Sequence, residues 1–226
     1  MKFQMNFTTS YDDVIRFTSV EDLQHFYIEH GCTGLEVMPL GYSTKDALDV
    51  YLPAEECPLI QPDMVTGIHC CCSGDWVKRN RSELIRHYRK DLDYAIRMGA
   101  EYVVFHVVQV DDGEGRTYKT KHTDWEVIEE ADDFINALLD GQQYPFWFLM
   151  ENLWWPGLTF LHPEDPMERF CKVYEHIFQI DRHEPFTAKG VEELVRRIDP
   201  LYVTYEYITR SREELSAYLQ AGRLRL

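Results

Sequence analysis

Short apolar runs alternate with longer amphipathic stretches along most of the chain, and this alternation constrains the fold more than any other feature. Six of the runs are predicted strands, and several are almost continuously apolar, as strands buried on both faces are. They lie near Lys2–Phe7, Leu35–Met38, Met64–His69, Tyr102–Val108, Phe146–Glu151 and Tyr202–Ile208. Because long segments connect them, the strands are predicted to be parallel and to belong to βα units.

Start and stop signals mark the helices between these strands. Ser19-Val-Glu-Asp resembles a capping box, and the helix that follows it is predicted to end at Gly31. A longer helix spans about Ser82 to Met98, with Gly99 as its natural terminator. The capping pattern recurs at Ser211-Arg-Glu-Glu, which predicts a final helix.

With 226 residues, the chain is long enough for one sizeable core and too short for two, so we expect a single domain over residues 1–226. An atypical segment covers about residues 157–200, where helices are predicted at Met167–Ile180 and Val191–Ile198 but no strand. A closed eightfold barrel usually takes about 250 residues. The expected fold class is therefore α/β, an incomplete or open TIM-barrel-like (β/α) barrel of about six strands. A homodimer or a covering helix would protect its exposed sheet edges.

The composition limits the partners that we expect. The chain has 23 basic and 39 acidic residues, a formal charge of −16, which repels phosphate backbones and disfavours a nucleic-acid partner. The first ten residues contain no apolar signal-peptide core, and no charge-free run approaches the roughly 18 residues of a membrane helix, so we expect a soluble, unexported protein. Six cysteines match neither a disulfide framework nor paired zinc knuckles, so we expect reduced thiols and a cytoplasmic protein. Small neutral or phosphorylated molecules, carbohydrates among them, remain as expected ligands, because a pocket can be locally positive or carry a metal while the outer surface is acidic.

Four of the predicted strands carry one ionisable residue at or near the downstream end: His69, His106, Glu151 and Glu206. The carboxyl ends of parallel barrel strands meet at one face, so these side chains are predicted to gather there. A carboxylate at the end of a buried strand costs several kcal/mol unless it is paired, hydrogen-bonded or bound to a cation. Two carboxylates and two imidazoles together predict either a metal site or an acid–base pair.

Several neighbouring residues have two interpretations. Glu36 belongs either to the same ring of side chains or to an ion pair with a lysine or arginine of a neighbouring strand. Trp154, which follows Glu151-Asn152, either forms an apolar wall for a sugar ring or packs in the core. Arg210, just after the last strand, either clamps a phosphate or carboxylate or makes a surface salt bridge. Each histidine alone also fits a hydrogen-bonded core position.

Four short motifs together resemble the xylose-isomerase-like TIM barrels. They are Gly34-Leu-Glu-Val, Gly67-Ile-His, Met98-Gly-Ala followed by Val104-Phe-His, and Met150-Glu-Asn. The similarity covers most of Met1–Gly157 and resumes near Tyr174–Leu219. That superfamily includes sugar-phosphate isomerases and epimerases, and endonuclease IV.

The resemblance implies a chemistry for the predicted site. In the isomerases and epimerases, the glutamates matching Glu151 and Glu206 bind a divalent metal, here Mn, Mg, Co or Zn, and move protons between adjacent sugar carbons. Histidines matching His69 and His106 line the substrate site or, in the endonuclease branch, bind zinc. Glu36, Asn152 and the two residues Trp154 and Arg210 are assigned to substrate binding. The family's Asp-Thr-Gly-His motif does not occur in this sequence, so the metal is either retained by a reduced ligand set or lost.

Three functional hypotheses follow. The first is a divalent-metal-dependent sugar or sugar-phosphate isomerase or epimerase with Glu151 and Glu206 as ligands and acid–base groups. The alternative is a non-catalytic, degenerate barrel that binds carbohydrate or serves as a subunit of an assembly. Endonuclease-like phosphodiester cleavage comes last, because the acidic surface and the incomplete ligand set oppose it.

Overall fold

The computed structural model describes residues 4–10, 16–38, 58–70, 81–106, 124–151, 188–207 and 209–224. Its strands are β1 (Gln4–Ser10), β2 (Gly34–Met38), β3 (Val65–His69), β4 (Tyr102–His106), β5 (Trp147–Glu151) and β6 (Tyr202–Tyr205). Its helices are α2 (Val20–Glu29), η2 (Pro62–Met64), α3 (Arg81–Met98), α4 (Asp124–Leu139), α6 (Ala188–Ile198) and α7 (Arg212–Ala221). All six predicted strands are present.

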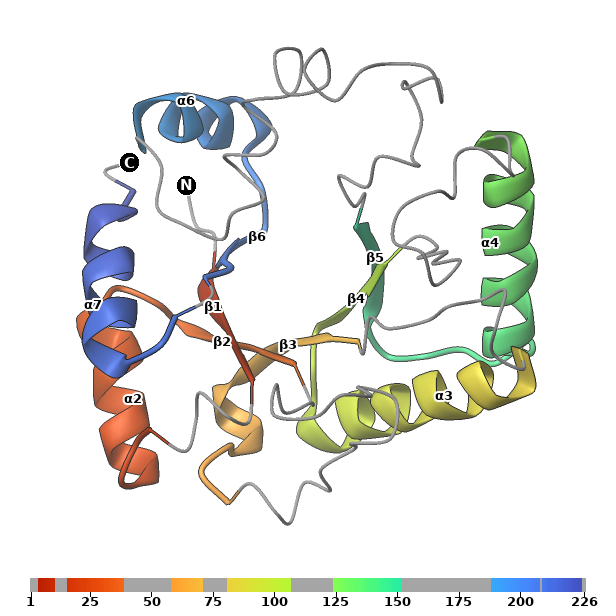
Figure 1. The fold of residues 1–226 in the computed structure, drawn as a ribbon, viewed down its shortest axis with the longest axis horizontal. Helices are drawn as coiled ribbons and strands as arrows, with labels where there is room; N and C mark the ends of the chain where they lie inside the picture. The colour runs from red at the N-terminus through yellow and green to blue at the C-terminus, as the bar shows by residue number, and fades with distance from the viewer. Residues whose placement is uncertain are drawn as a thin grey trace.

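The strands form one sheet in the order β5-β4-β3-β2-β1-β6, and every neighbouring pair is parallel. The last strand pairs with the first, as it does when a βα barrel closes. Within the described residues β5 and β6 are the edges of the sheet, so the curled sheet is a half-barrel (Figure 1). The predicted incomplete TIM-barrel-like fold is confirmed.

The hydrophobic core lies between the outer face of this sheet and the helices that surround it (Figure 1). Alternate residues of the strands point outward and are almost fully buried: Phe7, Leu35, Val37, Ile68, Val103 and Phe105. The helices meet them with residues spaced three or four apart: Leu23 and Phe26 of α2, Tyr88, Leu92 and Ala95 of α3, Phe134 and Leu138 of α4, and Leu215 and Leu219 of α7. This two-layer packing aims the intervening strand residues at the concave inner face.

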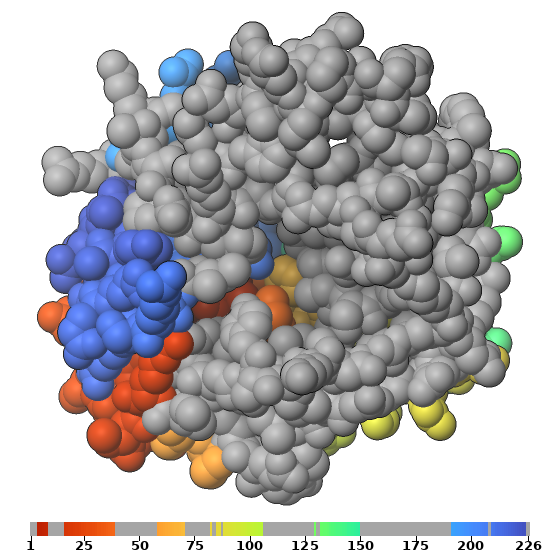
Figure 2. Space-filling view, viewed as in Figure 1, coloured from red at the N-terminus to blue at the C-terminus, as the bar shows by residue number. Residues whose placement is uncertain are grey.

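The inner face is polar where the outer face is apolar. Its buried side chains alternate with the core residues along the same strands and include Asn6, Thr8, Glu36, His69 and Tyr102. A polar group buried in this way costs free energy unless it finds a hydrogen-bond partner. The inner face is therefore where the structure places its polar chemistry. In the space-filling view, atoms of the strands are visible through an opening at the centre of the molecule (Figure 2).

The helix ends follow the predicted signals, with one difference. Ser19 Oγ accepts the N–H of Asp22 at 3.1 Å, and Ser211 Oγ accepts that of Glu214 at 3.2 Å. The Asp22 carboxylate does not complete a capping box with Ser19, because it accepts the N–H of Thr18 at 3.0 Å. Gly31 and Gly99 end their helices with φ of 79° and 67°, values that glycine adopts without strain.

Other predicted boundaries move by a few residues. Strand β1 continues to Ser10, beyond the predicted end, and β6 stops at Tyr205, so Glu206 directly follows the strand. Helix α4 adds to the predicted helices, and its signal is the spacing of the buried Phe134 and Leu138. The predicted helix over residues 167–180 lies outside the described residues. Among the helices that are described, none combines the length and the apolar character that crossing a bilayer requires.

Candidate functional site

The sheet register aligns the predicted site residues at the carboxyl ends of neighbouring strands. His106, the last residue of β4, is the cross-strand partner of Glu151, the last residue of β5. His69 ends β3 and is level with Val104, two residues before His106. The side chains of His106 and Glu151 lie outside the described residues. Glu206 is half-buried directly after β6.

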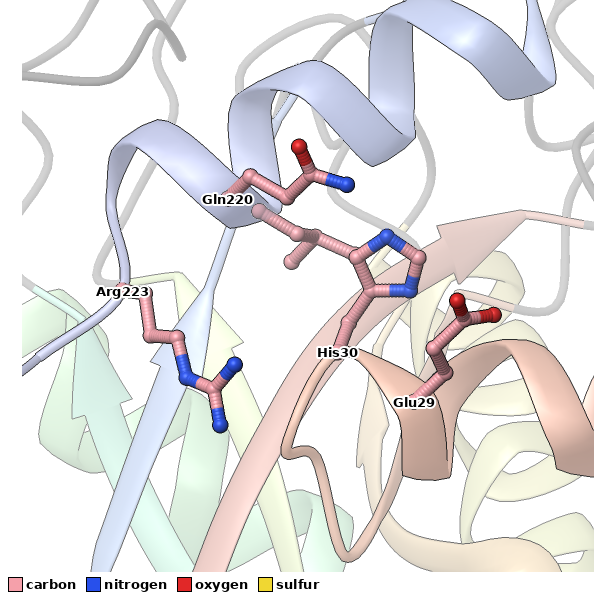
Figure 3. Close-up of a pocket in the computed structure, with 5 residues that line it drawn as sticks. Glu29, His30, Gln220 and Arg223 are labelled. Atoms are coloured by element: carbon pink, nitrogen blue, oxygen red, sulfur yellow. The ribbon is translucent and has the colours of Figure 1, made fainter.

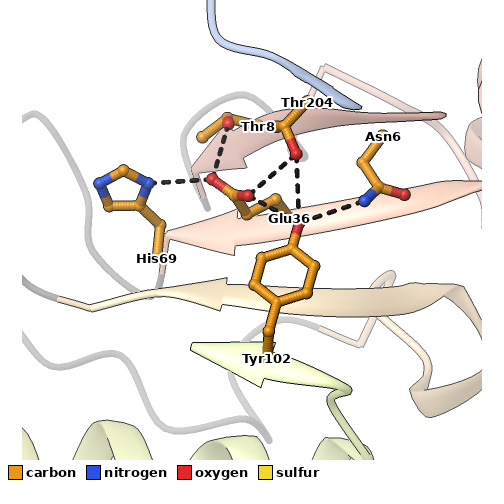
Figure 4. Close-up of polar contacts among 6 residues, drawn as sticks. All are labelled: Asn6, Thr8, Glu36, His69, Tyr102 and Thr204. Carbon is orange, nitrogen blue, oxygen red and sulfur yellow. Dashed lines mark hydrogen bonds and ion pairs between the residues drawn. The ribbon is translucent and has the colours of Figure 1, made fainter. Parts of the chain in front are cut away.

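A buried carboxylate–imidazole pair lies on the inner face between β2 and β3. His69 Nδ1 is 2.9 Å from Glu36 Oε1, and the two residues are 1% and 4% exposed (Figure 4). Their positions follow from the strands, because Glu36 lies between the outward-facing Leu35 and Val37, and His69 follows Ile68. The backbone after His69 is held as well, since the N–H of Cys70 donates to the carbonyl of Val104 at 3.0 Å.

Three hydroxyl groups also converge on Glu36. Thr8 Oγ1 donates to Oε1 at 3.2 Å, while Tyr102 OH and Thr204 Oγ1 lie 2.7 and 3.1 Å from Oε2 (Figure 4). The contacts of Glu36 among the described residues are thus one imidazole and three hydroxyls, rather than the lysine or arginine of the ion-pair interpretation. Donors surround both carboxylate oxygens, so Glu36 has little capacity left to ligate a metal or accept a further proton.

Tyr102 connects the Glu36 carboxylate to residues of β1 and β6. Its hydroxyl accepts from Asn6 Nδ2 at 3.1 Å and lies 3.1 Å from Thr204 Oγ1. The hydroxyls of Tyr102 and Thr204 contact each other, and both contact Glu36 Oε2. These three contacts share two hydroxyl protons, so at most two of them are hydrogen bonds at one time. The ring crosses β3 directly over Gly67, where an added Cβ would lie 2.3 Å from two ring carbons. Residue 67 must be glycine for the tyrosine to reach Glu36.

The electrostatics of the pair follow from burial and hydrogen bonding. Burial alone raises the pKa of Glu36, but the His69 hydrogen bond and charge, with the Tyr102 and Thr204 hydroxyls, outweigh it and leave the pKa below its ordinary value. Burial raises the pKa of Tyr102, and the Glu36 charge raises it further. Glu36 is therefore ionised and Tyr102 is a neutral donor.

The other predicted substrate-binding residues are placed only in part. Arg210 is exposed between β6 and α7, where its backbone N–H donates to Glu214 Oε2 at 2.5 Å. This contact does not involve the guanidinium group, so phosphate binding by Arg210 stays a prediction. Asn152 and Trp154 lie outside the described residues, and their assignments stay predictions too.

Sequence reasoning missed the polar residues around Glu36 other than His69. Asn6 and Thr8 flank the core residue Phe7, Tyr102 precedes Val103, and Thr204 lies two residues before Glu206. Their signal is weak but present: each is a polar or hydroxyl-bearing residue at an alternating position in an apolar strand. Which carboxylate they serve depends on the curl of the sheet.

Two further features bear on ligand binding. Across the parts of the chain that the structure describes, no three His, Cys, Asp or Glu side chains are grouped so that they could hold a metal ion. A pocket of about 240 Å³ lies between α2 and α7, on the outside of the sheet, lined by Glu29, His30, Leu219, Gln220 and Arg223 (Figure 3). None of the predicted site residues lines this pocket.

Comparison with known proteins identifies the fold. No protein-family model matches the chain, and no curated protein matches it. Among solved structures, endonuclease IV from Thermus thermophilus is similar over 97% of both chains, with 13% identity and a TM-score of 0.49. A sugar phosphate isomerase/epimerase from Parabacteroides distasonis has 11% identity and a TM-score of 0.50, covering 98% of this chain and 94% of that one.

At this level of identity the likeness to the isomerase/epimerase concerns the fold alone. It agrees with the strand order, in which the last strand pairs with the first, and with the helices outside a curled parallel sheet. The chain therefore has the fold of the xylose-isomerase-like TIM barrels, with six strands in its described residues.

Proposed function

We propose that the protein is a divalent-metal-dependent sugar or sugar-phosphate isomerase or epimerase, which moves a proton between carbons next to a carbonyl. The observation that carries the proposal is the buried Glu36–His69 pair on the inner face of a half-barrel. His69 is the last residue of β3, and βα barrels place their active sites at these strand ends. Similarity to the fold of a sugar phosphate isomerase/epimerase supports the reaction class.

The donor types at the strand ends suit a divalent metal. In the proposal His69, His106, Glu151 and Glu206 would hold the ion, a set of imidazoles and carboxylates that matches Mn, Co or Zn better than Mg. The Glu36 hydrogen bond to His69 Nδ1 fits this role, because metal-binding histidines almost always donate their other ring N–H to a carboxylate, a carbonyl or water. When bound, the ion would polarise the substrate carbonyl and stabilise negative charge on its oxygen.

The chain's own carboxylates carry the proton in this proposal. Glu151 and Glu206 stand at the ends of β5 and β6, the two edge strands of the described sheet, so a substrate lying between them would meet one on each side. One removes the proton from the carbon next to the carbonyl, and the proton is returned to the neighbouring carbon or to the opposite face of the same carbon. Glu36 takes no part in the transfer, because its oxygens are already surrounded by donors.

Proton transfer can be followed without knowing the sugar. The full chain, loaded in turn with Mn²⁺, Co²⁺, Zn²⁺ and Mg²⁺, is incubated in D₂O with a panel of aldoses, ketoses and their phosphates. We expect metal uptake by mass spectrometry and deuterium at the carbon next to the carbonyl by NMR. Glu151→Gln is expected to lower the exchange rate at least about 100-fold, the scale of a lost general base.

Glu193→Gln, on an exposed position of α6, is the matched control and should exchange like the original protein. If the protein takes up none of the four metals, or exchanges no substrate in the panel, the catalytic proposal is wrong.

A second candidate is a non-catalytic barrel that binds carbohydrate. One observation favours it: both carboxylate oxygens of Glu36 accept hydrogen bonds from the chain's own donors, as in a structural polar core. It predicts saturation-transfer NMR signals from bound sugars with no deuterium exchange. Protection of the open sheet by a homodimer also stays a prediction, which light scattering tests. Endonuclease-like cleavage is disfavoured, because the formal charge of −16 opposes DNA binding.

A further inference from the structure

We propose that Glu36 is a positioning residue that holds His69 in the tautomer with a proton on Nδ1, so that Nε2 is presented as the ligand or base nitrogen. In its role toward the metal, the inference rests on the proposed function. As a statement about the tautomer it stands on the geometry alone.

Proton counting assigns the tautomer. The carboxylate of Glu36 has no proton to donate, so the 2.9 Å contact with His69 Nδ1 requires a proton on the imidazole nitrogen. When His69 is uncharged, its imidazole has a single N–H, which leaves the lone pair on Nε2. Nε2 lies on the side of the ring directed away from Glu36 (Figure 4).

The network explains why Glu36 acts through His69. Thr8 lies on the same oxygen as His69, and Tyr102 and Thr204 lie on the other, so the carboxylate cannot rotate without breaking several contacts. These donors come from β1, β4 and β6, on either side of Glu36 in the sheet. A carboxylate that is held by hydrogen bonds from three strands keeps one orientation, and its hydrogen bond with Nδ1 therefore fixes the plane of the imidazole.

The decisive measurement uses the metal-free full chain with ¹⁵N-labelled histidine. Two-bond ¹H–¹⁵N correlation spectra at pH 8.5, where an ordinary imidazole is neutral, distinguish the two tautomers. We expect His69 to be protonated on Nδ1 in the original protein, a result that requires no variant to fold. A proton on Nε2 and none on Nδ1 in the original protein would overturn the inference.

Two variants separate positioning from simple stabilisation. Glu36→Ala removes the acceptor of the His69 N–H, and we expect the tautomer population of His69 to shift toward Nε2–H. Tyr102→Phe removes a donor from the same carboxylate without touching His69, and it should keep the original tautomer. If both variants, or neither, change the His69 tautomer, Glu36 does not position the imidazole.

Metal binding provides a second readout that does not depend on turnover. Removing the carboxylate behind a metal-binding histidine typically weakens the metal by about 10–100-fold. Titration with Co²⁺, followed by its visible spectrum, should show that loss for Glu36→Ala and most of the original affinity for Tyr102→Phe. Equal affinities for the original protein and Glu36→Ala would overturn the role toward the metal.

The two proposals can fail separately. If the original protein has the Nδ1–H tautomer but binds no metal and exchanges no substrate, the proposed function is wrong and the positioning of His69 by Glu36 is supported. If metal binds and substrate exchanges while His69 carries its proton on Nε2, the positioning inference is wrong and the proposed function is supported.

Discussion

The hydroxyl of Tyr102 on β4 lies 3.1 Å from Thr204 Oγ1 on β6, although three strands separate β4 from β6 in the sheet. A single tyrosine side chain can make this contact only because the sheet curls strongly around its inner face. Both hydroxyls contact Oε2 of Glu36 on β2. The centroids of the Tyr102 and Tyr202 rings are 4.8 Å apart. The half-barrel is thus braced across its interior by residues that contact Glu36, the partner of His69.

Tyr102→Phe should destabilise the fold. The variant removes a hydrogen bond to a buried charged carboxylate, a class of bond worth about 1.5–3 kcal/mol. Urea unfolding should show a lower midpoint with an unchanged slope. Tyr144→Phe, whose hydroxyl bonds to Gln142 at the surface, is the control and should change the free energy of unfolding by less than about 0.5 kcal/mol. Equal effects of the two variants would contradict the brace.

Gly67→Ala should also destabilise the fold, for a steric reason. The new methyl group would lie 2.3 Å from two ring carbons of Tyr102, and overpacking of this kind costs about 1–3 kcal/mol. The cost should be much smaller in a Tyr102→Leu background, where no ring crosses residue 67. A double-mutant cycle measures this coupling, and strictly additive free energies of unfolding would show that the ring does not press on Gly67.

The ion pair between α2 and α7 predicts a pH dependence of stability. The hydrogen bond from Arg212, followed by that from the Thr18 N–H, lowers the pKa of Asp22 from 3.8 to about 2. Because the folded-state pKa is lowered, the contribution is fully present above pH 3.8 and is lost as the pH falls through about 2.

Asp22→Asn should therefore be less stable than the original protein at pH 7, and the difference should shrink as the pH falls from 3.8 to about 2. Urea unfolding of both proteins across this range measures the difference. Asp132→Asn, at an exposed position of α4, is the control and should track the original protein. A difference between Asp22→Asn and the original protein that does not change with pH would rule out the ionised Asp22–Arg212 pair as its source.

Ser216→Ala should loosen the contact between the same two helices. His30 Nδ1 donates to the carbonyl of Phe26 at 2.7 Å, so Nε2 accepts from Ser216 Oγ at 2.8 Å. Loss of that donor should cost about 1 kcal/mol in urea unfolding. Gln220→Ala removes an exposed partner of the same serine and should cost less than about 0.5 kcal/mol. If Ser216→Ala leaves the free energy of unfolding unchanged, water replaces the hydroxyl.

Local sequence patterns predicted most of the fold. The helices begin after Ser19 and Ser211 and end at Gly31 and Gly99 as predicted. Capping bonds and positive φ depend on neighbouring residues, so the local sequence specifies them. Several strand ends differ from the predicted ones, and α4 was not predicted although Phe134 and Leu138 are spaced as on one face of a helix. Those errors are local and leave the half-barrel unchanged.

The sequence by itself determined that the chain forms parallel βα units and that its ionisable residues lie at strand ends, because burial sets the apolar period along each strand. Only the tertiary structure decided the partners of Glu36. They lie 28, 33, 66 and 168 residues away, at Thr8, His69, Tyr102 and Thr204. No local pattern specifies such contacts, since the pairing order and curl of the whole sheet bring these four side chains to one carboxylate.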